Sequence, residues 1–453
     1  MLTYTGIPLL TLSGVRDSIS QAVADGATTE VAASCYYDKL KDILQYNPSW
    51  VMMPSFLKDG KAYTMISGLS GSLNVTRTTT PTASRATRVN ASGFIETVTD
   101  NVLRLDYPIG GGCPALLVEP SAQNLALQSE NFGTTWSPNQ LIAFGSGSVL
   151  NTTGTLDPYG TNVSDLIVAS TVSGVQHRID QTTTSASGSY TFSVFVKAAG
   201  YNFTWLRIGT VGAFFNLSNG AITGTSAGIV ASSQNYGNGW YRCIISKASS
   251  SANEVLRINI IQTDGVTDFA GDGTSGIYVF GAQYETGSIA TTYIPTTTAA
   301  VSRAADVISA SGALVSGLIG QTEGTMYFEV SDVKGVGTGT GNPALAIRDK
   351  GFTNWIGLIS NSVSTPFRIQ VRSTTTTLIN YTSAIAEGKA AIAYSASGAV
   401  VYVNGVEVAS TATNPNLTLN LVRMEQYMTF KVKSLALYTT RLSNDQLAEL
   451  TRL

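Results

Sequence analysis

The sequence has few charged residues and a single histidine. Only 12% of its 453 residues are Asp, Glu, Lys or Arg, and its formal net charge is −2. A chain with so little charge has no basic field to attract a phosphate backbone, so we do not expect nucleic-acid binding. Because the one histidine is His177, metal sites that need two histidines or a His-Cys cluster are excluded.

Cysteines and long apolar runs are also scarce. Cys35, Cys113 and Cys243 are far apart and odd in number, which predicts buried apolar side chains rather than a disulfide framework or a metal site. The sequence has no stretch of about 18 apolar residues, and its start lacks the basic and apolar segments of a signal peptide. We therefore expect a chain that is made in the cytoplasm and does not enter a membrane by a signal of its own.

Ser, Thr and Gly are abundant instead, with 44 glycines. This composition favours strands joined by tight turns over long helices. A chain of this length has room for two to four domains, each with its own core. We therefore predict a mainly β protein, in which a short α-helical N-terminal segment is followed by a β-connector and two β-sandwich domains.

Changes in residue pattern divide the chain into four parts. Residues 1–60 carry apolar side chains at nearly helical spacing, which predicts two short helices interrupted near Gly26. Residues 61–118 contain short β-rich runs and form the connector. In residues 119–298, strands follow one another at intervals of about 8–12 residues with Gly-rich turns between them, which is typical of a jelly roll. Residues 299–453 form a second all-β unit.

Local turn and capping signals support this division. Asn404-Gly405 between two strands predicts a type I′ hairpin turn, and Ser443 with Gln446 predicts the capping box of a short C-terminal helix. The tripeptide Ser-Arg-Ala at 84–86 recurs at 302–304. We interpret the two copies as equivalent entrances to two domains.

Residues 84–136 join turn residues to short strands in a particular order. The stretch resembles a module of many tailed-phage tail and head fibre proteins, in which it bridges a virion-attachment region to a carbohydrate-binding jelly roll. The family pattern reads SRATRVN-x-G-x-IE and then DY-x-G-CP-LL-EP-x-x-N-L-x-SE-x-F. The positions that match it are Arg85, Arg88, Asn90, Gly93, Glu96, Asp106, Tyr107, Cys113, Pro114, Glu119, Pro120, Asn124, Ser129 and Glu130.

The resemblance extends over residues 75–306. Segments 190–197, 237–242 and 271–279 resemble internal strands of the phage jelly roll, and 293–296 resembles its closing strand. The strand, hairpin and capped helix at the end of the chain resemble a laminin-G or concanavalin-A-like lectin domain.

These resemblances imply a phage virion fibre subunit on the head or tail that binds host-surface or environmental glycans. Such fibres are usually homotrimers, made in the bacterial host cytoplasm and displayed on the virion surface. Residues 1–60 would then dock on other virion proteins or trimerise the chain, and the alternative for them is a helical cap on the first β-domain.

The titratable residues give little support to catalysis. Residues 224–228 fit the G-x-S-x-G pattern of serine hydrolases but lack the helix that should follow, and the required base, His177, is expected at the surface or at a strand end. Glu329 and Asp332 are the nearest approach to a glycosidase carboxylate motif, and their spacing is wrong. We expect no enzyme. The alternatives that stay open are a tailspike-type polysaccharide depolymerase and a capsid decoration protein that binds only virion proteins.

Two candidate binding sites follow. Sugar binding needs flat apolar faces with planar polar partners beside them, and Tyr201, Trp205, Asn354 and Trp355 are the candidates, with core packing as the alternative for each aromatic ring. Asp264, Asp268 and Asp272 lie close enough in sequence to converge on a structural calcium ion. The alternative is that these Asp residues only form turns.

Overall fold

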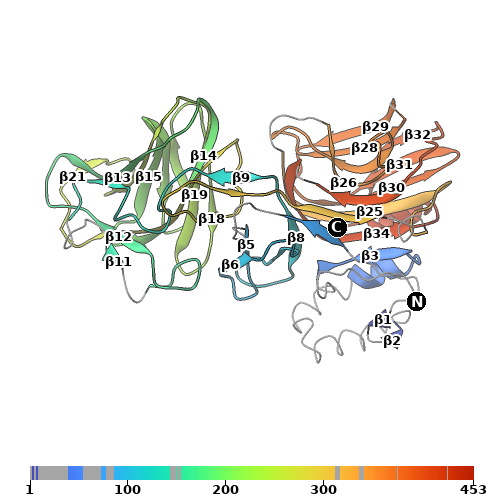
Figure 1. Ribbon diagram of the computed structural model, residues 1–453, viewed down its shortest axis with the longest axis horizontal. Helices are drawn as coiled ribbons and strands as arrows, with labels where there is room; N and C mark the ends of the chain where they lie inside the picture. Colours follow the sequence, from blue (N-terminus) through green and yellow to red (C-terminus); the bar gives the residue numbers. More distant parts are fainter. Residues whose placement is uncertain are drawn as a thin grey trace. The chain divides into compact units, whose positions relative to one another are not determined.

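The computed structural model describes residues 3–4, 7–8, 39–54, 73–77, 86–142, 150–151, 155–311, 317–335, 341–374, 376–425 and 427–453. Strands make up 51% of it and helix 4%, so the predicted mainly β fold is confirmed. The chain forms two compact units. Unit 1 comprises Met1–Thr78, Asp100–Ser121 and Ala304–Leu453, and unit 2 comprises Thr79–Thr99 and Ala122–Arg303. Their strands are labelled in Figure 1.

Unit 2 contains two large antiparallel sheets. The first, in spatial order, has β10 (Ser137–Asn139), β13 (Val175–Thr182), β20 (Val255–Ile261), β15 (Phe203–Ile208), β16 (Val211–Asn216) and β17 (Ile222–Thr225), and β21 (Asp268–Phe269) pairs with β13. The second has β11 (Leu150–Asn151), β12 (Asp165–Val168), β22 (Gly276–Thr286), β14 (Gly188–Ala199), β19 (Trp240–Ser250) and β18 (Ile229–Asn235).

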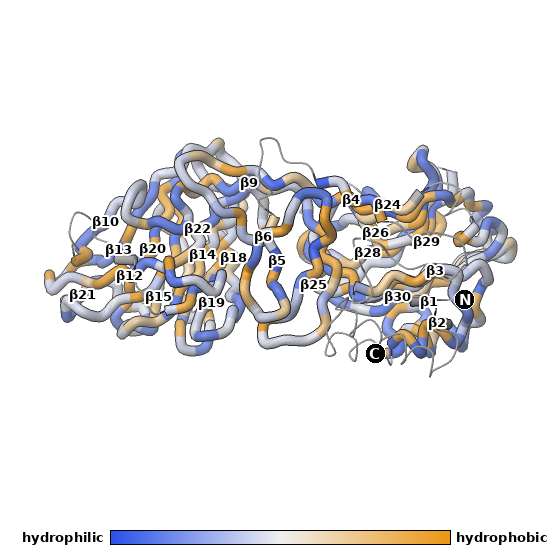
Figure 2. Tube along the Cα trace, turned by 60° about the horizontal axis from the view of Figure 1, so that its bottom comes forward, coloured by the Kyte–Doolittle hydropathy of each residue, from blue (hydrophilic) through white to orange (hydrophobic). Residues whose placement is uncertain are grey.

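One hydrophobic core joins these two sheets. Apolar side chains at alternate positions of each strand point into it, such as Leu206 and Ile258 from the first sheet and Phe192 and Val194 from the second. Figure 2 shows hydrophobic residues recurring along these strands. The side chains at the intervening positions point to the opposite side of each sheet.

Two short pairings complete unit 2. The hairpin of β5 (Ala86–Val89) and β6 (Ile95–Val98) holds the Arg88–Glu96 ion pair of the fibre-like motif, at 2.6 Å. The strands β9 (Ala122–Asn124) and β23 (Val301–Arg303) pair with each other. Ser84 and Arg85 lie outside the described residues, so the predicted equivalence of 84–86 with 302–304 stays a prediction.

Unit 1 is a second two-sheet structure with its own core. Its first sheet has β29 (Thr376–Ser383), β28 (Phe367–Ser373), β27 (Trp355–Ile359), β26 (Pro343–Arg348), β33 (Leu421–Met424), β24 (Val307–Ser311) and β4 (Asn74–Thr76). Its second has β32 (Val406–Thr411), β31 (Gly398–Val403), β30 (Gly388–Ser395), β25 (Gly324–Gly335), β34 (Met428–Tyr438), β8 (Ala115–Val118) and β7 (Leu105–Asp106), with β3 (Trp50–Met52) paired to β34.

Two of the local signals in unit 1 are confirmed. Asn404 and Gly405 both have positive φ, 51° and 85°, between β31 and β32, as a type I′ turn requires. Ser443 and Gln446 form the capping box of α4 (Asn444–Leu450).

The helical parts of unit 1 are short. Residues 39–44 are helical, and a small core joins Leu40 and Ile43 to Leu447 and Leu450 of α4. A two-stranded pairing joins β1 (Thr3–Tyr4) and β2 (Ile7–Pro8). The break near Gly26 and the rest of the two predicted helices lie outside the described residues. No helix in the described ranges is long and apolar enough to cross a membrane.

The cysteines differ from one another. Cys243 is a free, buried thiol in the core of unit 2, as predicted. Burial raises its pKa well above the ordinary value. Cys113 is disulfide-bonded, so its interpretation as a reduced apolar side chain was wrong. The spacing of three distant cysteines does not indicate which of them form a disulfide bond.

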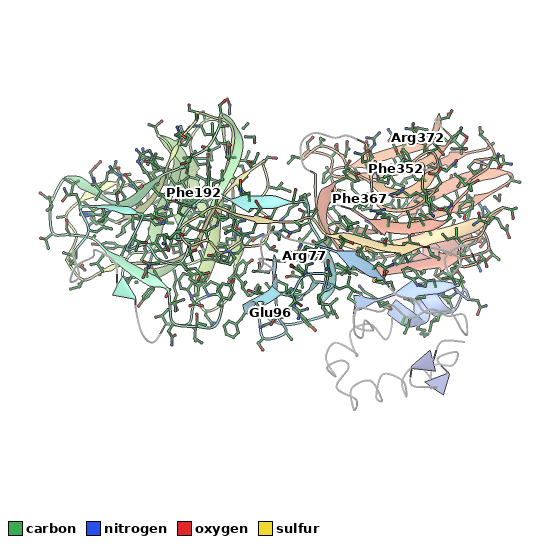
Figure 3. All side chains as sticks on the ribbon, viewed as in Figure 1. Arg77, Glu96, Phe192, Phe352, Phe367 and Arg372 are labelled. Atoms are coloured by element: carbon green, nitrogen blue, oxygen red, sulfur yellow. The ribbon has the colours of Figure 1, made fainter. Side chains whose placement is uncertain are left out.

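A buried ionic network links the three chain segments of unit 1. Arg77, labelled in Figure 3, contacts Asp306 at 2.7 Å. Arg104 contacts both Asp306 and Glu119, the latter at 2.7 Å. The side chains of these four residues are at most 2% exposed. Burial alone would lower the pKa of Arg104, but the two carboxylates raise it above its usual value, so the guanidinium is held charged.

We expect Arg104→Met to destabilise unit 1 strongly. The substitution leaves the Glu119 and Asp306 carboxylates buried with less counter-charge, which typically costs about 3–5 kcal/mol. The control is Arg441→Met in the same unit, because Arg441 makes only local hydrogen bonds to Leu442 and Asn444 and should cost about 1 kcal/mol or less. Urea denaturation measures both, and equal losses would contradict the role given to the network.

Asp165 should make unit 2 less stable as the pH rises. Its carboxylate accepts a hydrogen bond from the Phe132 amide at 2.7 Å, and burial raises its pKa to about 6. The folded state therefore binds the proton more tightly than the unfolded chain, so this stabilisation is complete below about pH 4 and is lost as the pH rises through about 6.

Asp165→Asn keeps an acceptor oxygen without the charge. We expect it to exceed the parent protein in stability by about 3 kcal/mol at pH 7 and to match it below about pH 4. Denaturation curves between these pH values measure the difference. A gap that does not change with pH would contradict the assignment.

Candidate functional site

The side of the first sheet of unit 2 that faces away from the core carries aromatic and polar groups in register. Trp205 on β15 lies opposite Asn259 on β20 and Phe214 on β16. The neighbouring residues Leu206 and Ile258 point into the core. Because side chains alternate along a strand, the first three share the outward side.

A second row of side chains lies beside the first. Arg207 on β15 is opposite Arg257 on β20, and Arg257 is opposite Asp180 on β13. Arg178, two residues before Asp180, is opposite Asn259 and so belongs to the first row. We call this outward surface the Trp205 face; it comprises Gln176, Arg178, Asp180, Trp205, Arg207, Phe214, Arg257 and Asn259.

Trp205 and its neighbours form a layered stack. The rings of Trp205 and Phe214 are nearly parallel, at 13°, with centroids 4.9 Å apart. The Arg207 guanidinium carbon lies 4.1 Å from the centroid of the Trp205 ring. The strand beyond Phe214 presents Gly224 in register with it. Since Gly224 has no side chain, β17 adds none beside the Phe214 ring at this position.

On the Trp205 face, Arg178 donates to Asp180 at 3.0 and 3.1 Å and Arg257 donates to the Gly209 carbonyl, whereas the hydrogen bonds to Gln176 are long. The Gln176 side-chain oxygen accepts from Arg178 at 3.3 Å and from Arg207 and Asn259 at 3.4 Å. Typical bonds of this kind are about 2.9–3.0 Å. One acceptor is therefore shared by three donors, none of them closely bound.

Four buried polar atoms of the Trp205 face have no hydrogen-bond partner among the described residues. They are Trp205 Nε1, Arg207 Nε, Arg257 Nε and Asn259 Oδ1. A buried polar atom left without a partner typically costs about 1–3 kcal/mol, so groups of this kind are normally satisfied. The polar groups beneath this aromatic stack are therefore incompletely satisfied within the protein.

The electrostatics of the Trp205 face are dominated by its guanidinium groups. Burial lowers the pKa of Arg207 to about 10, and the neighbouring Arg257 and Arg178 act in the same direction, against Asp180. Asp180 itself contacts Arg178 at 3.0 Å and Arg257 at 3.6 Å. The positive charge on this face is therefore only partly balanced.

Of the sugar-binding candidates in unit 2, Trp205 lies on this face and Tyr201 does not. Tyr201 is 9% exposed and belongs to the hydrophobic core, with its ring centroid 5.3 Å from that of Phe269. Burial raises the pKa of its hydroxyl. Tyr201 therefore packs in the core, which is the alternative that the sequence left open for it.

The other two sugar-binding candidates lie in unit 1. Trp355 is 5% exposed, its Nε1 donates to Gln370 at 3.3 Å, and the Arg372 guanidinium lies 4.6 Å from its ring centroid. The amide of Asn354 bonds to Asp349 and Thr353, and its oxygen accepts from the Thr374 amide at 3.0 Å. Both side chains are thus engaged within the protein. Figure 3 labels Arg372 in this unit.

The three calcium-ligand candidates are engaged separately. Asp264 accepts from Thr223 at 2.6 Å, and Asp268 accepts from Thr267 at 2.9 Å. Asp272 accepts from the amides of residues 274 and 275, which together with the Ser275 hydroxyl lower its pKa. In the described part of the chain, no group of three or more His, Cys, Asp or Glu side chains is placed to hold a metal ion. These hydrogen bonds within the loops agree better with the alternative left open for the three Asp residues, namely that they shape turns.

The hydrolase-like residues are also engaged elsewhere. Ser226 Oγ accepts a hydrogen bond from the Gly212 amide at 3.1 Å. His177 is fully buried, and its two ring nitrogens contact the carbonyl oxygens of Gln140 and Phe269 at 2.5 and 3.0 Å. The expected surface or strand-end position of His177 was wrong. Neither ring nitrogen is left to serve as a base for Ser226.

Sequence reasoning missed most of the Trp205 face, namely Gln176, Arg178, Asp180, Arg207, Phe214, Arg257 and Asn259. One signal was present. Large polar residues alternate with apolar ones in Arg178-Ile179-Asp180 and in Arg257-Ile258-Asn259, a pattern that predicts a strand with one exposed side. Which of these strands would be neighbours was not visible in that pattern.

Comparisons with known proteins assign no family to the chain. No model of a known protein family and no curated protein matches it. Among solved structures, it is similar to the botulinum neurotoxin type C structure described as dependent on two ganglioside molecules for cell entry, with 10% identity and a TM-score of 0.26. That similarity covers 32% of this chain and 39% of the neurotoxin chain, so the chain spans about two fifths of its length.

Two further structures show similarly weak likeness. A Trypanosoma rangeli sialidase in complex with sialic acid has 11% identity and a TM-score of 0.24, over 67% of this chain and 61% of that one. A tandem CBM22 domain from Paenibacillus barcinonensis Xyn10C has 9% identity and a TM-score of 0.21, over 70% of this chain and 98% of that one. At such TM-scores we draw no conclusion about this chain from any of the three.

The contrast between Tyr201 and Trp205 can be tested by their stability. Tyr201→Ala should destabilise unit 2 by about 3–5 kcal/mol because it empties a core position. Trp205→Ala should cost less than half as much, since the ring is only partly buried on the outer side of the sheet. Urea denaturation of the two variants measures this. A larger loss for Trp205→Ala would show that its ring is a core element.

Proposed function

We propose that this chain is a phage virion fibre subunit that adheres to glycans through the Trp205 face without transforming them. The observation that carries the proposal is the outward stack of Phe214, Trp205 and Arg207, with half-buried polar side chains beside it. They offer a ligand both polar and aromatic contacts on one surface.

The chemistry of a sugar suits this arrangement. A pyranose has an apolar C–H side that packs on aromatic rings and a rim of hydroxyls that needs donors and acceptors. Phe214 offers the ring, because Gly224 beside it carries no side chain. The half-buried side chains of Gln176, Arg178 and Asp180 offer donors and acceptors for hydroxyl groups.

The virion part of the proposal is supported by the fibre-like motif. Its ion pair Arg88–Glu96 lies in a hairpin, and its Glu119 is part of the buried ionic network. In this proposal the chain lies on the virion surface as a homotrimer, residues 1–60 dock on other virion proteins, and host-surface glycans are the ligands.

A non-catalytic role fits the carboxylate on the Trp205 face. Among the residues of β13, β20, β15 and β16, Asp180 is the only acidic one. It is paired with Arg178 and Arg257. The other carboxylate on this side of the sheet, Asp268, is opposite Gln176, four residues and about 13 Å from Asp180 along β13, which is farther than the separation of about 5–10 Å between the two carboxyl groups of a glycosidase. A depolymerase would need a carboxylate pair elsewhere in the chain, and a capsid decoration protein would need no glycan at all.

We expect Gly224→Leu to weaken glycan binding. A Cβ at this position would lie 3.3 Å from the Phe214 ring, so a leucine would cover the surface offered to a sugar and lower affinity about tenfold or more. Gly317→Leu in unit 1 is the matched control, since a Cβ there meets nothing within 4 Å. A glycan array followed by titration with the strongest hit measures the effect.

Three outcomes separate the candidate functions. Binding without new reducing ends supports adhesion, whereas new reducing ends from incubated polysaccharide would establish the depolymerase. An array without hits, together with binding to purified virion proteins, would favour the decoration protein. Unchanged glycan affinity in the Gly224→Leu variant would remove the Trp205 face from the proposal.

A further inference from the structure

We infer that the ligand of the Trp205 face is an acidic oligosaccharide, whose carboxylate is received by Arg207 and Arg257 while a neighbouring sugar packs on Phe214. The inference rests on the proposed function and names the chemical class of its ligand.

The first support is the local charge. Arg178, Arg207 and Arg257 share this side of the sheet with two carboxylates. Asp180 lies on β13, and Asp268 on β21 is opposite Gln176. The local charge is therefore +1 (three Arg minus two Asp). The whole chain carries a net charge of −2 with only 12% charged residues. An excess of positive charge on one sheet surface of such a chain attracts anionic ligands.

The second support is that Arg207 lacks a counter-ion. Asp180 is within ion-pair distance of Arg178 and Arg257, but no described residue forms a salt bridge with Arg207. The terminal nitrogens of Arg207 reach only the Gln176 side chain at 3.4 Å and the Thr210 carbonyl at 3.5 Å. At 9% exposure, this guanidinium has lost most of its contact with water without gaining a charged partner.

The third support is the pairing of two guanidinium groups. Arg207 and Arg257 are directly opposite each other on adjacent strands, and the carboxylate that Arg257 approaches, Asp180, is shared with Arg178. A carboxylate has two oxygens, and guanidinium groups bind such a group through paired, charge-assisted hydrogen bonds. A neutral hydroxyl would supply one oxygen and no charge.

The spacing suits a ligand of at least two sugar units. Phe214 lies one strand from β15, which carries Arg207, and two strands from β20, which carries Arg257. Neighbouring strands are about 4.8 Å apart, and Phe214 is two residues farther along the sheet than the arginines. The distance to bridge is therefore about 8–12 Å. One sugar on Phe214 therefore leaves the carboxylate of the next within reach of the arginines.

The test compares acidic oligosaccharides with their own carboxyl-reduced forms. The probes are oligosaccharides of hyaluronan, of polygalacturonate and of polysialic acid, each before and after chemical reduction of the carboxylate to an alcohol. Calorimetric titration of the full chain measures each affinity. We expect at least one acidic probe to bind about tenfold or more tightly than its reduced form, because charge-assisted hydrogen bonds are lost on reduction.

Substitutions then locate the effect. Arg207→Gln and Arg257→Gln should each weaken binding of the acidic probe about tenfold and weaken binding of the reduced probe by a clearly smaller factor. Arg441→Gln in unit 1 is the control and should change neither. Thermal unfolding of each variant checks that unit 2 is intact, and the comparison of probes on the unsubstituted protein does not depend on any variant folding.

The possible results separate a failure of this inference from a failure of the proposed function on which it rests. Equal affinity for acidic and reduced probes, or binding only to neutral glycans, would overturn the acidic ligand and leave glycan adhesion standing. Acid-selective binding that survives both arginine substitutions would overturn the assignment to this face. No binding to any acidic or neutral glycan would overturn both the inference and the proposed function.

Discussion

The buried pairing of Arg77 and Arg104 with Glu119 and Asp306 is the constraint on which the architecture of unit 1 depends. These residues come from the three separate chain segments that make up the unit. Ion pairs out of contact with water are costly unless every partner is present, so the segments are specified together. Two residues of the network belong to segment 100–121, which also supplies β7 and β8 to the sheet of β34.

The main cores use alternate residues of each strand, and smaller cores cover the outer side of the second sheet of each unit. The outer side of the first sheet of unit 2 has no such cover among the described residues. In unit 2 that side carries the Trp205 face, where the rigid ladder of β13, β20, β15 and β16 fixes the spacing of aromatic and charged groups. A surface held by four paired strands changes little in shape when a ligand arrives. Recognition would then depend on which side chains project from it rather than on movement of a loop.

Much of the fold could be predicted from sequence, because its signals are local. Alternation and Gly-rich turns gave the mainly β architecture, Asn404-Gly405 gave a hairpin, and Ser443 with Gln446 gave a capped helix. The site could be predicted only in part. Trp205 was selected, but Arg207 and Arg257 are 50 residues apart and meet only through strand pairing. Tyr201 and Trp205 are equally aromatic and close in sequence, and only the direction of each side chain puts one in the core.

The short pairing of β9 with β23 has a consequence for how such chains diversify. Ala122 and Arg303, the first and last residues of the long segment of unit 2, are direct partners in that pairing, so the chain leaves and rejoins unit 1 at points about 5 Å apart. Insertions whose ends are this close are well tolerated by a host domain. A recombination that exchanged residues 122–303 would retain the residues of the buried ionic network while replacing the strands that carry the aromatic stack. The segment Thr79–Thr99 would have to change with it, because its Ile95 packs against Phe195 and Trp240.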